Sequence, residues 1–488
     1  MAPARSRLPI VRRARSGVIL GKHVTIIRDN QKSFADSVPV VVVGAGACGL
    51  TAALAAVDGG ADVLVLERDE RPGGSTGMSI GAVCAAGTAE QRAHGIEDST
   101  AAFVEDVLAK TEGRADRALT ELIGRESGPA VDWLAEQHAV PLQLDFAWTG
   151  LGHSRPRLHA PPGRTGEELL GRLSTAAERS GVALVTEALV TDLYADASDR
   201  VLGVRIARPD GSHEELGCSA VVLATCGFGG NHSMIAKHIP AMANARYFGH
   251  EGNRGDGILW GAALGGEAAD MSAYQGLGTL ADPQSIIVPH TLMIDGGVLV
   301  NVRGQRFTHE LANISGMCIP VLAQPEGRAW VLFDQQRLTA SLGHSIELQQ
   351  LKQLGAVKSA AHLPALESQM GVAAGSLTQT LAQVAASKAA GTVDSLGRSF
   401  AKLDALAPPY CAIRVTGALF HTQGGLRVDS EARVLRADGT ALPNLFAGGG
   451  TARSISGPDV TGYLPAMGLC MAITLGRIAG RAAARQVR

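Results

Sequence analysis

Residue types and spacing that could bind a phosphate occur at residues 44–49. This segment lies between a β-branched run and an alanine-rich run, and it contains Gly44, Ala45, Gly46, Ala47, Cys48 and Gly49. In a strand–turn–helix, the first glycine permits the tight turn, the second lets a diphosphate approach the backbone, and the third allows close helix–strand packing. Glu67 follows about twenty residues later, where an acid can accept hydrogen bonds from two ribose hydroxyls. The pattern predicts a dinucleotide site with an unphosphorylated ribose.

A second loop of small residues decides between the two dinucleotides that remain, FAD and NAD. Residues 71–76 read Arg-Pro-Gly-Gly-Ser-Thr and residues 79–82 read Ser-Ile-Gly-Ala, shortly after the acid. A cofactor as long as FAD needs such a loop to pass its ribityl chain and isoalloxazine ring, whereas a NAD domain has no use for it. Because no second complete G-x-G-x-x-G with a following acid is present, we expect FAD and no separate NAD(P) domain.

The elements that must position this site form a βαβ unit. Residues 39–43 and 62–67 are apolar β-branched runs that predict buried parallel strands, and residues 47–58 predict a helix that ends at a glycine pair. These elements make the fold class α/β. The further elements expected along the chain are helices at about 99–134, 166–180, 335–402 and 465–486, strands at about 182–190, 202–208, 220–224 and 442–447, and a hairpin at about 292–302.

Composition excludes several classes of protein. The 488 residues suffice for two or three packed units, and a formal net charge of −2 gives no field that favours nucleic acid. The seven cysteines include no C-x-x-C pair, so we expect neither a disulfide framework nor a metal site, and we expect a cytoplasmic location. No apolar run is long enough to span a membrane. Residues 1–37 are basic without the apolar stretch of a signal peptide, which predicts a tail or an added strand outside the core.

Many segments, in one order, resemble the FAD-dependent fumarate reductase and succinate dehydrogenase flavoprotein superfamily. They are VVVGAGACGLTAALAA, LERDERPGGSTG, VVLATCGFGGN, GNRGDGILWGAALGG, RGQRFTHE, HTQGGLRVD, PNLFAGG and GLCMAITLGRIAG. The resemblance, over about residues 38–485, implies a discontinuous Rossmann-type FAD-binding domain, residues 38–246 and 402–488, with an inserted α+β capping domain, residues 247–401. It also implies an active site between the cap and the flavin.

The resemblance further implies which residues surround the cofactor. Besides residues 44–49 and Glu67, these are Arg68, Gly74, Ser75, Thr76, Ser79, Ile80, Gly81, Ala224, Thr225, Cys226, Gly227, Asn231, Asp256, Gly448, Gly449, Gly468 and Leu469. Cys226 stands where the family's ATGGFGGN segment has a glycine, so one small residue replaces another. Covalent members attach FAD through a histidine near the Gly74–Ser75 loop. Because this loop contains no histidine, we expect dissociable FAD.

Most substrate-binding residues of the fumarate reductases are missing from the corresponding positions. Ile314 replaces the arginine proton donor, which follows the acid of the R-F-x-x-E motif by four residues, and a second substrate histidine falls near Leu277. The clamp arginine of the C-terminal motif falls on Tyr463, and the one retained residue is His421 of HTQGG. Because two carboxylates need matched cationic donors, the sequence argues against fumarate and succinate as substrates.

Tyr463 is similar to the catalytic tyrosine of the 3-ketosteroid dehydrogenase-like branch, but Y-P-G is absent, so the steroid substrate is not carried over. Desaturation beside a carbonyl needs removal of a proton, stabilisation of an enolate and transfer of a hydride to flavin N5. We expect Tyr463 to be the base or acid, helped by the N-terminus of the following helix, and His421 to polarise the carbonyl. Tyr274 is a further candidate in the cap. Arg306 and Arg453 are candidates to replace the missing cations.

Three functions stay open at this point. The first is α,β-dehydrogenation of a ketone or acyl substrate, with a quinone or flavoprotein as electron partner. The second is the reverse reaction, reduction of an activated C=C bond in a substrate that is not a dicarboxylate. The third is a flavin-binding electron-transfer subunit. Packing roles are alternatives for Tyr463 and His421, and His153 and His159 are expected to be solvated because their loop is rich in proline and glycine.

Overall fold

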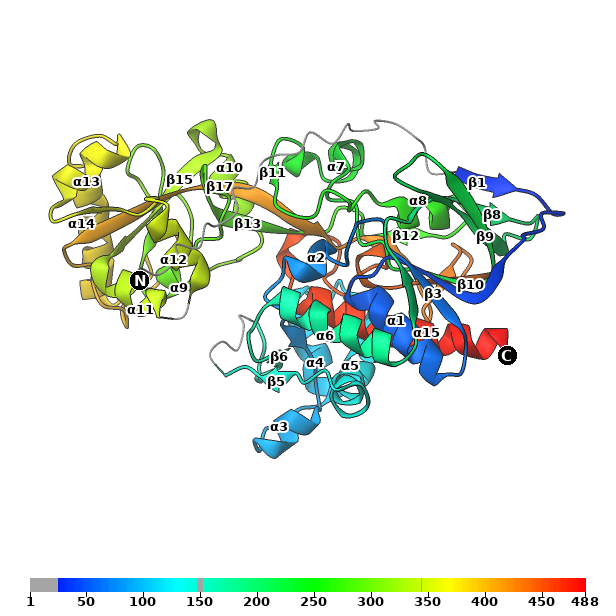
Figure 1. The fold of residues 1–488 in the computed structure, drawn as a ribbon. Coiled ribbons are helices and arrows are strands. Elements are labelled where there is room, and N and C mark those ends of the chain that lie inside the picture. Colours follow the sequence, from blue (N-terminus) through cyan, green and yellow to red (C-terminus); the bar gives the residue numbers. More distant parts are fainter. Residues whose placement is uncertain (1–24, 147–151, 344) are drawn as a thin grey trace, which may run out of the picture.

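The structure, a computed structural model, describes residues 25–146, 152–343 and 345–488. Figure 1 shows two parts, a larger one that contains the elements from β1 to α7 and the last helix, and a smaller one formed by the middle of the chain. The strands β13 (Tyr274–Ala281) and β17 (Tyr410–Thr422) run from the smaller part into the larger one. We call the smaller part the cap.

A nine-stranded mixed sheet forms the centre of the larger part. Its strands follow the order β1-β8-β9-β10-β2-β3-β7, and β20 pairs with both β10 and β19. The strands are β1 (Thr25–Arg28), β2 (Ser37–Val43), β3 (Val63–Leu66), β7 (Ala183–Val185), β8 (Leu189–Ala195), β9 (Val201–Ala207), β10 (His213–Leu223), β19 (Arg433–Leu435) and β20 (Ala441–Ala447). Residues 40–43 of β2 are buried, because neighbouring strands are parallel and helices cover the sheet.

Helices that are distant in sequence pack closely in this part. The predicted βαβ helix α1 lies against the C-terminal helix α15, and a Cβ atom at Gly480 would lie 2.0 Å from the carbonyl oxygen of Ala52. Glycine at this position therefore permits the contact. The helices of this part are α1 (Ala47–Asp58), α2 (Gly74–Gly77), α3 (Ala89–Ala93), α4 (Thr100–Lys110), α5 (Arg117–His138), α6 (Gly166–Arg179), α7 (His232–His238), α8 (Asp256–Ala263) and α15 (Met467–Val487).

The smaller part is an α+β unit built on a second sheet. This sheet has the order β11-β17-β15-β14, and β13 and β16 also pair with β17. Because β17 lies beyond residue 401, the cap sheet includes residues on both sides of the predicted domain boundary. The elements of this part are β11 (Arg246–Tyr247), β14 (Val298–Val300), β15 (Arg328–Asp334), β16 (Lys358–Ala360), α9 (Thr291–Ile294), α10 (Cys318–Leu322), α11 (Gln335–Leu342), α12 (Ile346–Gln353), α13 (Leu363–Met370) and α14 (Ser376–Ala390).

Short elements complete the fold between and beside the two sheets. The two-stranded and three-stranded sheets are formed by β12 (Ala268–Ala269) with β18 (Gly425–Leu426), and by β4 (Val83–Cys84), β6 (Leu158–Ala160) and β5 (Gln143–Leu144). The 3₁₀ helices are η1 (Pro240–Met242), η2 (Pro325–Gly327), η3 (Gly449–Thr451) and η4 (Val460–Gly462). Among the residues described, no helix is both long and apolar enough to cross a membrane.

The hairpin predicted at residues 292–302 is wrong. This stretch forms α9 and then β14, which pairs with β15 and not with a neighbouring strand of the same stretch. The backbone amides of Gly296 and Gly297 donate to the carbonyls of Met293 and Leu292, so the glycine pair ends a helix and does not turn a hairpin. At the N-terminus, the expected added strand is observed as β1, which pairs in parallel with β8. The rest of the expected extension, residues 1–24, lies outside the described residues.

Candidate active site

The first and third glycines of the 44–49 segment are required by the protein itself. Gly44 follows β2 with a φ of +104°, and a Cβ atom there would lie 2.6 Å from the carbonyl oxygen of Ala224. A Cβ atom at Gly49 would lie 1.8 Å from the carbonyl oxygen of Gly44. The tight turn and the close contact between α1 and β2 therefore exclude any larger residue at these two positions.

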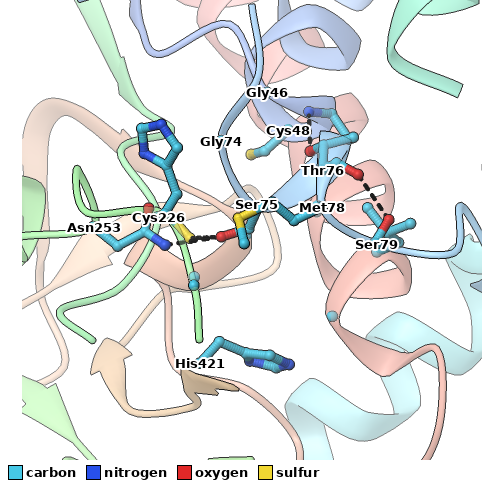
Figure 2. Close-up of a pocket in the computed structure, with 18 of the residues that line it drawn as sticks. Gly46, Cys48, Gly74, Ser75, Thr76, Met78, Ser79, Cys226, Asn253 and His421 are labelled. Atoms are coloured by element: carbon cyan, nitrogen blue, oxygen red, sulfur yellow. Dashed lines mark hydrogen bonds between the residues drawn. The ribbon is translucent and has the colours of Figure 1, made fainter. Parts of the chain in front are cut away.

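The second glycine faces open space at the N-terminus of α1. Gly46 has extended backbone angles, and the one atom within 4 Å of an added Cβ is the Oγ1 of Thr76, at 3.4 Å. The backbone amide of Ala47 donates to the same Oγ1 at 3.0 Å. Figure 2 shows Gly46 and Thr76 side by side at the pocket. A diphosphate fits here, because the positive end of the helix dipole faces a space in which the Thr76 hydroxyl is the one group within 4 Å of an added Cβ at Gly46.

The predicted ribose acid, Glu67, lies next to the glycine segment. Glu67 is 8% exposed at the end of β3, where its carboxylate accepts hydrogen bonds from the amides of Ala45 at 2.8 Å and Asp69 at 3.0 Å. These bonds fix the carboxylate beside the glycine turn. The neighbouring Arg68 donates to the carbonyl oxygen of Gly252 at 3.1 Å, which brings the start of the cap segment over this end of the site.

These residues line one cavity of about 430 Å³, which extends to both catalytic candidates of the C-terminal third. The predicted residues that line it are Gly44, Gly46, Ala47, Cys48, Glu67, Arg68, Gly74, Ser75, Thr76, Ser79, Ile80, Ala224, Thr225, Cys226, Asp256, Gly448, Gly449, Gly468, Leu469, His421 and Tyr463. The structure thus brings together the two glycine loops, the acid, and the two candidates from the other end of the chain.

Five of the predicted cofactor residues do not line the cavity but shape the loops around it. They are Ala45, Gly49, Gly81, Gly227 and Asn231. A Cβ atom would lie 2.5 Å from the carbonyl oxygen of Thr165 at Gly81 and 2.1 Å from Thr422 Oγ1 at Gly227. Asn231 caps α7 by accepting from the amide of Met234. Gly81 and Gly227 therefore permit close packing next to the cavity, and Asn231 caps a helix.

Cys226 occupies a conformation that favours glycine. Its φ is +63°, and its Sγ lies 3.3 Å from the Oγ of Ser75 inside the pocket. Burial raises the pKa of the Cys226 thiol, so the side chain is a small neutral group at the cofactor loop. The replacement of the family's glycine is accommodated without loss of the cavity.

Sequence reasoning missed several residues of the site. Asn253 is 5% exposed and donates from Nδ2 to Ser75 Oγ at 2.8 Å and to the Tyr247 hydroxyl at 2.9 Å. Its segment, GNRGDG, was part of the family resemblance and could have indicated it. Residues 188–190 at the start of β8 also line the cavity near Glu67 and Arg68, and nothing in their types distinguishes them from an ordinary strand.

Tyr463 and His421 lie together at the other end of the cavity. Their rings meet edge to face with centroids 5.5 Å apart. His421 is near the end of β17, and burial lowers the pKa of its imidazole to about 4, so the ring is neutral at neutral pH. Burial raises the pKa of the Tyr463 phenol above its ordinary range. A backbone hydrogen bond of Ala466, at the N-terminus of α15, lowers this pKa, but burial outweighs it, so Tyr463 holds its proton.

The remaining catalytic candidates are not at the site. Tyr274 does not line the cavity and packs with Phe228 and Met234 in an apolar cluster. Arg306 bonds to Glu310 at 2.8 Å and to Asp394, and Arg453 bonds to Asp270 at 2.6 Å and to Asp116 at 3.0 Å. Neither arginine lines the cavity, so they do not replace the cations that the sequence lacks.

Apolar side chains surround the cavity where the cap meets the two catalytic candidates. They are Phe248, Ile287, Leu311, Ile314 and Phe420, and the rings of Phe248 and Phe420 are 5.3 Å apart. The described lining of the cavity contains one arginine, Arg68, which lies beside the ribose acid, and one lysine, Lys110. A dicarboxylate would need two cations converging on one substrate, and the lining does not provide them.

The expectation that His153 and His159 are solvated is wrong. His159 is fully buried on β6, where its Nδ1 donates to the carbonyl of Arg157 at 2.8 Å and its Nε2 accepts from Thr88 Oγ1 at 2.8 Å. His153 donates from Nε2 to the carbonyl of Pro465 at 3.0 Å. Long-range strand pairing of β6 with β4 and β5 buries this segment, which its proline and glycine content does not reveal.

The burial of His159 predicts a pH dependence of stability. Burial lowers the pKa of His159 from 6.5 to about 4, so the unfolded chain binds more protons between these values and stability falls as pH falls through this window. The loss approaches about 3 kcal/mol below the window. Chemical denaturation of H159Q at several pH values is expected to show a shallower pH slope than the wild type. H94Q, at an exposed histidine, serves as control, and equal slopes for H159Q and wild type would contradict the assignment.

The geometry can be compared with known proteins. The FAD binding domain family matches residues 39–462. The chain belongs to this family. FAD is therefore the cofactor, and the chain is an FAD-dependent oxidoreductase of the superfamily that includes fumarate reductases.

Relatives of this FAD binding domain protein match almost its whole length. A probable fumarate reductase of Shewanella frigidimarina is 29% identical over 92% of the chain and 75% of its own length. A urocanate reductase of Eggerthella lenta is 28% identical over 92% of the chain and 74% of its own length.

Two solved structures share the fold. The open conformation of a flavocytochrome c3 fumarate reductase superposes with a TM-score of 0.81 at 28% identity, covering 93% of this chain and 79% of that one. The 3-ketosteroid-Δ4-(5α)-dehydrogenase of Rhodococcus jostii, in complex with 4-androstene-3,17-dione, superposes with a TM-score of 0.75 at 28% identity. The match covers 94% of this chain and 100% of that one.

Proposed function

We propose that the FAD binding domain protein reduces the C=C bond of an α,β-unsaturated carbonyl compound that carries at most one carboxylate. The observation that carries this proposal is the pair His421 and Tyr463, which line the cavity together beside an apolar wall. Bound FAD supplies the hydride-transfer chemistry of such a reaction. The protein supplies the carbonyl contact, the proton and a cavity that binds an apolar substrate.

The charge of the lining supports the limit of one carboxylate. Arg68 lies beside the ribose acid and bonds to the cap backbone, which leaves Lys110 as the cation available to a substrate anion among the described lining residues. A second carboxylate would be desolvated among Phe248, Phe420 and Ile314 without a partner, at a cost of several kcal/mol. Fumarate, which the name of one relative specifies, has two carboxylates and therefore lies outside the proposed substrate class.

The protonation of the two side chains supports the reductive direction. Reduction of the C=C bond needs a proton donor for the α-carbon, and the Tyr463 phenol keeps its proton because burial raises its pKa. The neutral His421 can donate one hydrogen bond to the carbonyl oxygen, where negative charge develops. The names of the relatives, a fumarate reductase and a urocanate reductase, describe reductions of the same bond type.

Dehydrogenation of a saturated ketone or acyl compound is the second candidate. The similarity to a 3-ketosteroid dehydrogenase at 28% identity favours it, and the same two residues would serve in reverse, with Tyr463 accepting the proton. A role as electron-transfer subunit is less well supported, because the side chains of His421 and Tyr463 line the cavity. In all cases we propose dissociable FAD, cytoplasmic location, and a quinone or flavoprotein as the electron partner.

An anaerobic panel tests the function and its direction. Benzalacetone and cinnamate are mixed with dithionite-reduced holoprotein, and their saturated counterparts benzylacetone and hydrocinnamate are mixed with oxidised holoprotein. We expect the unsaturated compounds to restore the visible flavin absorbance, because the proton donor is in place. Bleaching of oxidised flavin by the saturated compounds alone would favour dehydrogenation. No response to any of the four would contradict both candidates.

A further inference from the structure

Gln423 lies two residues after His421 and is fixed by its backbone on both sides. Its amide donates to the carbonyl of Ala273 at 2.8 Å, and its carbonyl accepts from the amide of Ser454 at 2.9 Å. The side chain is 4% exposed. The side chain extends to the imidazole of His421 at the end of β17.

A chain of polar side chains leads from the protein interior to this imidazole. The Nε2 of Gln423 lies 2.8 Å from Nδ1 of His421, and the Oε1 of Gln423 accepts from Ser456 Oγ at 3.1 Å. Ser456 is 2% exposed and lies 3.2 Å from Ser454 Oγ, with Ser454 7% exposed. The amide nitrogen of Gln423 is the atom that faces the imidazole, and an amide nitrogen can only donate.

This bond determines where the imidazole carries its proton. A neutral histidine has one donor and one acceptor nitrogen, so Nδ1 accepts from Gln423 and Nε2 carries the proton. The Cε1–Nε2 edge faces Gly468 near the start of α15, where an added Cβ would lie 3.6 Å from Cε1 and 3.8 Å from Nε2. Gly468, His421 and Gln423 all line the cavity, and the Cε1–Nε2 edge is the one that Gln423 leaves free for a ligand.

We propose that Gln423, oriented by Ser456, is a positioning residue that holds His421 in the tautomer with its proton on Nε2, which donates to the carbonyl oxygen of a bound substrate. The carbonyl contact rests on the proposed function, whereas the tautomer does not. Without this donor, the imidazole could present a lone pair to the carbonyl, which would repel the developing negative charge. The role parallels that of second partners that fix the tautomers of other functional histidines.

The surroundings keep the imidazole neutral, so that the tautomer decides its function. Burial lowers the pKa of His421 to about 4, and no charged side chain contributes to this shift. The ring of Tyr463 meets the imidazole edge to face. The Tyr463 phenol is itself neutral, because burial raises its pKa. Across the physiological range, His421 therefore has no charge, and its donor is the Nε2 proton.

NMR of ¹⁵N-histidine-labelled, oxidised holoprotein tests the proposal directly, with H421Q used to assign the resonances. In the wild type we expect a neutral imidazole with a protonated Nε2 and a hydrogen-bonded, unprotonated Nδ1. In Q423M, the Nδ1 resonance is expected to move toward that of a ring nitrogen without a hydrogen bond. In Q423E, the carboxylate can only accept, so Nδ1 gains a proton and the pKa of the imidazole rises.

The matched control is Q369M, which changes an exposed glutamine of α13 in the cap and is expected to leave the His421 resonances in place. A wild-type Nδ1 that carries the proton, or His421 resonances that Q423M and Q423E leave unchanged, would overturn the proposal. The readout needs no turnover. If the tautomer is as expected but the substrate panel fails, the proposed function falls and the positioning role of Gln423 stands.

Discussion

Replacing Gly46 by valine is expected to give folded protein that does not retain FAD. The backbone of Gly46 is extended, and an added Cβ would meet no protein atom closer than Thr76 Oγ1 at 3.4 Å, so we expect the chain itself to tolerate the change. The valine methyl groups would instead fill the space in which the diphosphate meets the amides of α1. Losing about two hydrogen bonds to charged oxygens weakens binding about a thousandfold. Fluorescence titration of apoprotein with FAD measures this change.

The control for this substitution is G171A, since an added Cβ at Gly171 of α6 meets nothing within 4 Å. Circular dichroism and thermal unfolding of the apoproteins are expected to be similar for G46V, G171A and wild type. G46V that binds FAD as tightly as wild type would show that the diphosphate lies elsewhere. By contrast, a substitution at Gly49 is expected to impair folding, because its Cβ would overlap the carbonyl of Gly44.

The second large effect is expected for Y463F. This variant removes the phenol proton but keeps the ring that meets His421 edge to face, so the cavity retains its shape. Without a proton donor at the α-carbon, the reaction is expected to slow about 10²- to 10⁴-fold, with little change in substrate affinity. Rapid-mixing reoxidation of reduced holoprotein by the most reactive compound of the panel measures this step separately from binding.

Tyr410 provides the matched control, because it lies at the start of β17 in the cap and packs in a different apolar cluster. Y410F is expected to reoxidise at the wild-type rate. The same rate in Y463F would assign Tyr463 a packing role over the flavin and would remove the proton donor from the mechanism. FAD content, measured in all three proteins, separates a slow reaction from a missing cofactor.

The cofactor half of the site could be predicted from the sequence because it is local. Residues 39–43 are β-branched and residues 47–58 are rich in alanine and leucine, so propensity, burial and the glycine turn agree on one βαβ unit. The bounds of α1 are those that were predicted. The acid Glu67 needs only the length of this unit to reach the ribose position, and the family resemblance located further lining residues on other segments of the chain.

The substrate half could not be predicted as well, because long-range pairing forms it. Tyr274 and His421 lie on the paired strands β13 and β17, and the pairing has a register shift between Gln275 and Gly276. In this arrangement the side chain of Tyr274 packs in the apolar cluster. The ion pair of Arg306 with Asp394 joins residues 88 positions apart in the sequence, and that of Arg453 with Asp116 joins residues 337 positions apart. Residue type alone does not show whether a cation faces a ligand or a carboxylate of the protein.

The most direct test of the account compares three oxidants of the same reduced protein. Dithionite-reduced holoprotein is mixed anaerobically with cinnamate, which has one carboxylate, with benzalacetone, which has none, and with fumarate, which has two. Recovery of the visible flavin absorbance is followed over time. Because the lining lacks two converging cations, we predict recovery at least about a hundredfold slower with fumarate than with the faster of the other two. Faster recovery with fumarate would contradict the account.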